Sequence, residues 1–401
     1  MLFNFNELSS VLLIFFFHGV VYACLLLWRG WQFQHRASRI LAVFILLCCL
    51  YICPWMLGHA GWYARDPYRD TMFYVPFQQV FFLGPVIFFY IQSLLNQSFQ
   101  FKKTDLWHFL PGILYLAYSL IVFVTDKWIL GENYFYADER DKDLAKWYQI
   151  AGLISMLLYF VASLRYYFTY KTLAYNTLSF AESVQFKWIR NFLIAFLLMQ
   201  FARLVFLVIY PEWGDFPQKW WYYFLFSLLF YYISIAGYSN TIQAVLPFTL
   251  SILDGSATLL PRSTELSSPP LESEPPAVPV TADIDIQPWK HQVEQLIKQE
   301  QLFTDPKLSL TDLAQRLDTN TRVISKTINQ GFEMNFNDYI NAHRVEAVKE
   351  AIRNGSSKEL TLLAIALDCG FNSKTTFNRA FKKHSGISPK SFLQQVLDKT
   401  E

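Results

Sequence analysis

The stretch Gly370–Phe392 reads GFNSKTTFNRAFKKHSGISPKSF, and the rest of the chain is organised around it. Its middle has the pattern of a short helix beginning after Ser373, whose hydroxyl can accept a hydrogen bond from a free first-turn amide. Apolar residues fall on one side of this helix, and the other side is polar: Thr375, Asn378, Arg379 and Lys382. The segment 370–396 holds five Lys or Arg and no acid, so it carries a positive electrostatic field that attracts phosphate groups. An ordinary solvated helix face is the alternative.

An upstream segment repeats this pattern, which favours a functional reading. Asn320 is the corresponding cap, and the outward spacing recurs at Arg322, Ser325, Lys326 and Asn329. A shorter predicted helix precedes each of the two, at Thr311–Leu317 and at Leu362–Leu367. Each pair is therefore a candidate helix-turn-helix unit. The periodic stretch Asn337–Arg353 predicts a helix connecting them.

Four motifs in this region carry a family resemblance: LSLTDLA, NFNDYINAHRV, IALDCGF and TTFNRAFKKHSGISPKSF. From about Trp289 to Val396 the chain resembles the DNA-binding domain of the AraC/XylS transcription regulators. The resemblance implies two helix-turn-helix units whose recognition helices enter successive major grooves of double-stranded promoter DNA, and it implies RNA polymerase as a partner. The implied base-facing residues are Arg322, Ser325 and Lys326 in the first unit and Lys374, Thr375, Asn378 and Arg379 in the second. Lys382 and Lys383 complete the implied DNA-binding set.

The first unit departs from the family pattern at two positions. Ile328 and Asn329 stand where the family often has an aromatic residue and a lysine. The first recognition helix is therefore less basic than the second, and we expect it to bind DNA more weakly.

The composition divides the 401-residue chain into two parts. The chain is 53% hydrophobic and 18% aromatic against 16% charged, and the aromatic excess lies before residue 240. That part contains apolar runs of about the length that a bilayer core requires. The seven runs are Leu8–Leu27, Ile40–Leu57, Pro76–Leu95, Trp107–Val124, Ile150–Phe168, Trp188–Tyr210 and Trp220–Tyr238. Since charged loops separate them, a seven-helix transmembrane bundle is favoured over a buried soluble core. The predicted fold class is all-α.

The flanks of the first run predict the orientation. Glu7 precedes it and Arg29, Arg36 and Arg39 follow it, so the N-terminus is expected outside. Seven crossings then place the C-terminal domain in the cytoplasm, where DNA is. We expect a multi-pass protein of the bacterial inner membrane, with the lipid bilayer as a partner and the loop Gly131–Arg140 outside.

Two features of the predicted bundle bear on sensing. Arg203 is the one clear charge inside a run. A charge within the membrane usually has a function, and here we expect a site for an anionic ligand. The alternative is that the side chain snorkels to the outer interface past Tyr210. The outer loop Thr125–Lys146 holds six acids and four bases. A solvated loop is the simpler interpretation of it, and a cap over a site is the other.

The segment Asp254–Gln287 contains six prolines between Pro261 and Pro279 and far more acids than bases. This composition predicts a disordered tether, and Pro288 then opens a helix Trp289–Glu300. The predicted domains are a sensor at 1–240, a juxtamembrane segment and linker at 241–287, and the DNA-binding domain at 288–401.

Three functions compete for this organisation. The favoured one is a membrane-bound one-component transcription regulator whose bundle senses an unknown ligand. A membrane transporter or enzyme with an autoregulating DNA-binding tail is the second, and a bundle that is only an anchor is the third. We find no Walker-type glycine loop, HExxH motif or Ser/His/Asp set, and we predict no catalytic residue, cofactor or metal. Because a disordered tether transmits proximity rather than rotation, we expect control by association of bundles into a homodimer.

Overall fold

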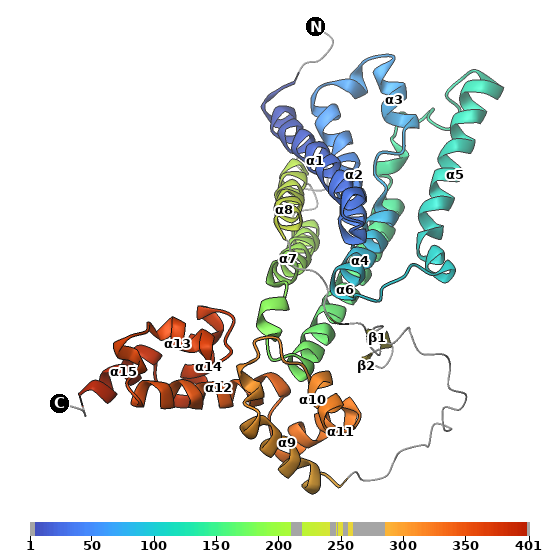
Figure 1. Cartoon of the computed structure of the whole chain (residues 1–401). Coiled ribbons are helices and arrows are strands. Elements are labelled where there is room, and N and C mark those ends of the chain that lie inside the picture. The colour runs from blue at the N-terminus through green and yellow to red at the C-terminus, as the bar shows by residue number, and fades with distance from the viewer. Residues whose placement is uncertain are drawn as a thin grey trace, which may run out of the picture. The chain divides into compact units, whose positions relative to one another are not determined.

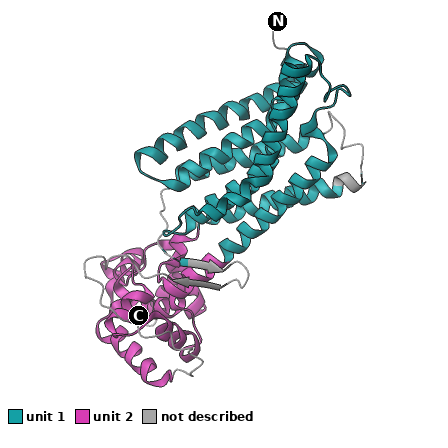
Figure 2. Ribbon diagram, turned by 90° about the vertical axis from the view of Figure 1, so that its right-hand side faces the viewer, with its two compact units in different colours: residues 1–168, 186–260 teal, residues 169–185, 261–401 magenta. Residues whose placement is uncertain are grey.

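The computed structural model describes residues 5–209, 219–240, 246, 248–251, 256–259 and 285–398. These residues are almost entirely helical, which confirms the predicted all-α class (Figure 1). The exception is one hairpin, in which β1 (Phe248–Ser251) pairs antiparallel with β2 (Ser256–Leu259). The chain divides into two compact units, residues 1–168 with 186–260 and residues 169–185 with 261–401 (Figure 2).

The first unit is built from long apolar helices with short connecting turns. Its α-helices are α1 (Glu7–Gln32), α2 (Arg36–His59), α3 (Tyr68–Tyr74), α4 (Val80–Leu95), α5 (Leu110–Val124), α6 (Lys146–Thr177), α7 (Lys187–Ile209) and α8 (Trp220–Ser239). The short helical turns in the same part of the chain are η1 (Trp62–Ala64), η2 (Lys103–Phe109), η3 (Thr125–Leu130), η4 (Lys142–Leu144) and η5 (Ala181–Val184). The end of α6 and all of η5 belong to the second unit.

Six helices in the described part of the chain are long and apolar enough to cross a membrane. The third predicted run, Pro76–Leu95, instead gives a helix of 16 residues that begins only at Val80. The segment before Val80 is held by a tertiary contact, because the backbone amide of Gln78 donates to the carboxylate of Asp143, 65 residues away, at 2.8 Å. The resulting α4 is about 24 Å long, less than the roughly 30 Å of a bilayer core.

Helix α2 lies at the centre of the first unit and packs against α1, α4 and α8. Close approach to α1 depends on Gly19, since a Cβ there would lie 2.3 Å from Cys49 Sγ. Pro54 and Pro85 sit inside α2 and α4, which membrane helices tolerate when neighbouring groups satisfy the freed carbonyls, whereas Pro111 lies in the first turn of α5 and interrupts nothing. The bundle therefore tolerates two internal prolines.

The loop Thr125–Lys146 is only partly the solvated loop that its charges predicted, since Glu132, Asp138 and Glu139 are exposed but its other acids are not. Three of its acids are buried, with 0–8% of each residue exposed: Asp126, Asp141 and Asp143. The hydroxyl of Tyr63 donates to Asp141 at 2.5 Å, and that of Tyr115 donates to Asp143 at 2.6 Å. The number of charges in the loop did not predict this burial, because the hydroxyl donors come from elements that are far away in the sequence. Burial, with the neighbouring Asp143 adding to it, raises the pKa of Asp141 to about 7.

The second unit is a helical domain with two hydrophobic cores joined by one helix. Its helices are α9 (Gln287–Gln299), η7 (Leu302–Thr304), α10 (Leu310–Arg316), α11 (Thr321–Lys326), η8 (Thr327–Gly331), α12 (Phe336–Arg353), η9 (Ser356–Lys358), α13 (Leu362–Asp368), α14 (Lys374–Ser385) and α15 (Pro389–Leu397). Helix α12 contributes Tyr339 and Ile340 to the first core and Val345, Val348 and Ile352 to the second. The helix predicted as Asn337–Arg353 thus holds both halves together, and Pro288 opens α9 as expected.

Candidate nucleic-acid interface

The first helix-turn-helix unit consists of α10 and α11, and α11 begins at its predicted cap, Asn320. Ser309 and Asp312 form a reciprocal capping box at the start of α10. The side chain of Asn320 accepts a hydrogen bond from Val323 N at 2.9 Å at the start of α11. Ile324 is buried in the first core, so the helix is held by its apolar face and presents the opposite face outward.

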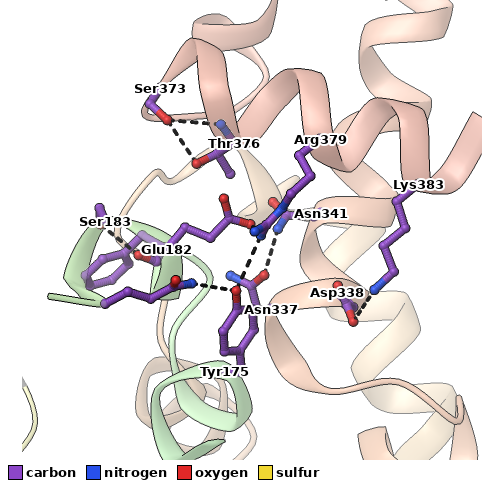
Figure 3. Close-up of polar contacts among 12 residues, drawn as sticks. Tyr175, Glu182, Ser183, Asn337, Asp338, Asn341, Ser373, Thr376, Arg379 and Lys383 are labelled. Carbon is purple, nitrogen blue, oxygen red and sulfur yellow. Dashed lines mark hydrogen bonds and ion pairs between the residues drawn. The ribbon is translucent and has the colours of Figure 1, made fainter. Parts of the chain in front are cut away.

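The second unit consists of α13 and α14, with a sharp turn between them at Gly370. Its φ of +92° is in the left-handed region, and a Cβ at this position would lie 2.2 Å from the carbonyl oxygen of Phe303. Only glycine fits this turn without displacing the backbone. Ser373 then caps α14 by accepting from Thr376 N at 3.1 Å, as the sequence predicted (Figure 3).

The apolar face of α14 is buried and its polar face is exposed, as the helical spacing predicted. Phe377, Ala380 and Phe381 pack into the second core. The exposed residues of the helix include all six of its predicted DNA-binding positions: Lys374, Thr375, Asn378, Arg379, Lys382 and Lys383. On α11, Arg322 is exposed, while Ser325 and Lys326 are half-buried. The second helix therefore offers the larger cationic surface, in line with its more basic sequence.

Two of these cations already face carboxylates. Lys383 Nζ lies 2.6 Å from a carboxylate oxygen of Asp338 on α12. Arg379 forms an ion pair with Glu182 of η5, and its Nη2 also lies 3.4 Å from the hydroxyl of Tyr175 (Figure 3). The surface that the sequence assigned to phosphate and bases is thus lined by acids from two other elements.

Helix α12 carries a buried polar stripe that the sequence pattern did not predict. Asn337, Asn341 and Arg344 are only 1–2% exposed. Arg344 donates from Nε to the carbonyl of Phe303 and from Nη2 to the carbonyl of Asp305, both at 2.7 Å. Burial lowers its pKa to about 10, partly opposed by Asp305, so the guanidinium stays charged at neutral pH. Arg344 lies four residues from both Ile340 and Val348, so helical spacing places it on the apolar side of α12. This spacing was the feature of the sequence that could have predicted the burial of Arg344.

Arg203, the predicted ligand-binding residue, lies in the first unit and is separate from this interface. Its guanidinium lies over the ring of Tyr222 at 4.4 Å from the centroid, and Nη2 lies 3.5 Å from Gln149 Oε1. The side chain therefore has aromatic and amide neighbours from α8 and α6 within the bundle.

Comparison with known proteins identifies the C-terminal part of the chain. Residues 313–395 match a family described as a helix-turn-helix domain. A solved structure described as a protein of unknown function from Listeria innocua is 26% identical, over 26% of this chain and 93% of that one, with a TM-score of 0.23. No curated protein matches the chain. Residues 313–395, which contain α11, α12, α13 and α14, are a DNA-binding helix-turn-helix domain of the AraC type.

Proposed function

We propose that this protein is a membrane-bound one-component transcription regulator, in which an N-terminal bundle senses a ligand or membrane state and the C-terminal domain binds promoter DNA. One observation carries the proposal. A domain with two helix-turn-helix units, each presenting a polar or cationic face, shares its chain with six helices of membrane-spanning length and apolarity.

The surface of the first unit supports insertion in a bilayer. Large apolar side chains on α1, α5, α6 and α7 are at least 60% exposed: Ile14, Phe17, Leu114, Leu120, Ile121, Leu158, Leu198 and Phe201. Such a surface is unfavourable in water but matches hydrocarbon. We assign 1–240 to a membrane sensor with α4 as a shorter seventh crossing, 241–287 to a connecting segment, and 288–401 to a cytoplasmic DNA-binding domain.

The predicted linker 254–287 lies mostly outside the described residues, and its described part includes strand β2 (Ser256–Leu259), so the prediction of disorder is wrong for those four residues. The proposed location is the bacterial inner membrane with the N-terminus outside. Within the bundle, Arg203 is the proposed contact for an anionic ligand, since it provides a cation among aromatic and amide groups. A homodimer and RNA polymerase remain the proposed protein partners.

The DNA-contact roles follow from exposure and chemistry. Arg379 presents a planar guanidinium that suits bidentate contact with guanine, and Lys383 suits a phosphate. On α11, Arg322 is the most exposed of the three proposed contacts, and Ser325 and Lys326 lie beside it on the helix.

The test begins with the full-length protein in lipid nanodiscs, used to capture genomic DNA fragments whose shared sequence is then measured by titration. Arg379→Ala should lose about 1–3 kcal/mol on that sequence and relax the preference at one base pair. Lys383→Ala should instead weaken all sequences alike and reduce the salt slope by about one unit. Failure of the intact protein and of every variant to enrich any sequence would refute the proposed function.

A further inference from the structure

Residues 169–185 comprise the last turns of α6 and most of the loop that leads to α7, and we call them the connection. They belong to the same compact unit as residues 261–401. Their backbone contacts the first helix-turn-helix unit directly. Ser179 N donates to the carbonyl of Leu308 at 3.1 Å, and Leu178 forms an antiparallel bridge with Ser309, the cap of α10. Leu178 and Ser179 are buried, with exposures of 3% and 0%. The connection is therefore folded against the domain rather than exposed beside it.

The polar stripe of α12 provides the side-chain half of this contact. Asn337 Nδ2 donates to the carbonyls of Leu178 and Ser179 at 3.2 and 2.8 Å. Arg344 donates to the carbonyl of Ser179 at 3.2 Å and to its hydroxyl at 3.1 Å. Two buried polar side chains of the DNA-binding domain are thus directed at one residue of the connection, which explains why α12 carries them among apolar neighbours.

The connection also reaches the recognition helix α14. Glu182 pairs with Arg379, and the Glu182 side chain is only 8% exposed while that of Arg379 is 50% exposed. Tyr175 lies against the same guanidinium, and its hydroxyl accepts from Gln185 Nε2 at 2.5 Å (Figure 3). A carboxylate from the connection therefore contacts the side chain that we assign to guanine.

A cleft of about 470 Å³ marks the shared surface. It is lined by Tyr175 and Glu182 from the connection and by Arg379, Lys382 and Lys383 from the recognition helix, with Asp338 and others from α12 and α14. The carboxylate of Glu182 pairs with Arg379, and that of Asp338 pairs with Lys383. In a complex with DNA, groups of the DNA would pair with these two cations instead.

We infer that residues 169–185 form a docking segment that competes with DNA for Arg379 and so holds the DNA-binding domain in an inhibited state. The inference rests on the proposed function, because it assumes that α14 is a DNA-reading helix. The contacts around Arg379 are polar and charged, so water and DNA phosphates can replace them when the segment leaves. Since 169–177 is the end of α6, movement of that helix would move the segment.

The first experiment compares DNA binding by the full-length protein and two variants in nanodiscs, using the captured sequence. Glu182→Gln keeps the shape of the side chain but removes its charge, and it should bind DNA at least about fivefold more tightly, the lower end of a typical coupling between sites. Glu346→Gln is the matched control, because it removes an equal charge from a 65% exposed side chain that pairs with Lys349. Its affinity should stay within about twofold of the wild type. Unchanged or weaker binding by Glu182→Gln would overturn the inference.

The second experiment detects the docked state without relying on affinity. A photoreactive benzoylphenylalanine in place of Tyr175 should cross-link to α14 in the absence of DNA, and saturating DNA should abolish the cross-link. Absence of the cross-link without DNA would refute docking, and its persistence with bound DNA would refute competition. If no protein in the set binds DNA while the cross-link still forms, the proposed function fails and the inhibitory role with it, whereas docking stands.

Discussion

Replacing Arg344 by methionine should destabilise the DNA-binding domain, because it removes a charged donor from a side-chain position that is only 1% exposed, at nearly constant volume. The carbonyls of Phe303 and Asp305 each lose a hydrogen bond of 2.7 Å. Asp305 keeps a donor, Leu308 N at 3.3 Å, and the carbonyl of Ser179, which also loses its bond to Arg344, keeps Asn337 Nδ2 at 2.8 Å. The larger penalty therefore falls on Phe303. At the usual cost of an unsatisfied buried acceptor, the loss is about 2–3 kcal/mol.

The assay is hydrogen exchange in the full-length protein reconstituted in nanodiscs, followed in peptides from α12. In amides that exchange by opening of the whole domain, 2–3 kcal/mol corresponds to exchange about 30- to 140-fold faster. Glu346→Gln on the same helix is the control, since the Glu346 carboxylate is 65% exposed and its pairing with Lys349 should contribute less than about 1 kcal/mol. Exchange in Arg344→Met within threefold of the wild type would show that the guanidinium does not hold the domain together.

Three further predictions concern other parts of the chain. Gly370→Ala should lower the free energy of unfolding by more than about 2 kcal/mol in thermal unfolding, because the φ of Gly370 is +92° and an added Cβ would meet Phe303 O. Gly331→Ala should be almost neutral, because no atom lies nearer than 3.5 Å to a Cβ added there. Equal effects of the two substitutions would refute the steric argument. Because the pKa of Asp141 is raised to about 7, this carboxyl contributes its whole stabilisation below about pH 4 and loses it as the pH rises through 7. Asp141→Asn should remove this dependence of stability on pH, which amide hydrogen exchange in the 132–145 peptide measures. A periplasm-active reporter after Glu401 should be silent, and activity there would refute seven crossings.

Local chemistry predicted much of the C-terminal domain correctly. The caps Asn320 and Ser373 each use a side chain to satisfy an amide three residues away, so a short window of sequence contains both partners. The division of α14 into an apolar and a cationic face is likewise a matter of helical spacing. Such features depend on neighbours along the chain and can be predicted without a structure.

Contacts between distant segments could not be predicted in this way. Tyr175 and Arg379 are 204 positions apart, and no periodicity connects them. The buried state of Asp143 depends on Gln78, in the segment before α4, and on Tyr115, which lies on α5. A charged residue in a polar loop is expected in water unless its partners are known, and those partners are set by tertiary packing. The same packing shortened α4 at its start.

The contacts of residues 169–185 change how a signal would reach the DNA-binding domain. A proline-rich linker relaxes an imposed rotation within a few residues, so on its own it favours control by association of bundles. The end of α6 is a second connection of a different kind, because α6 is a continuous α-helix of 32 residues and its last turns pack in the DNA-binding unit. A helix transmits displacement along its axis, and interface shifts of 1–2 Å are enough to exchange one set of polar contacts for another. Since Glu182 follows that helix by only five residues, a shift of this size in α6 would separate the carboxylate from Arg379 and expose the guanidinium to DNA. The linker would then set how far the released domain can reach, while α6 would decide when it is released.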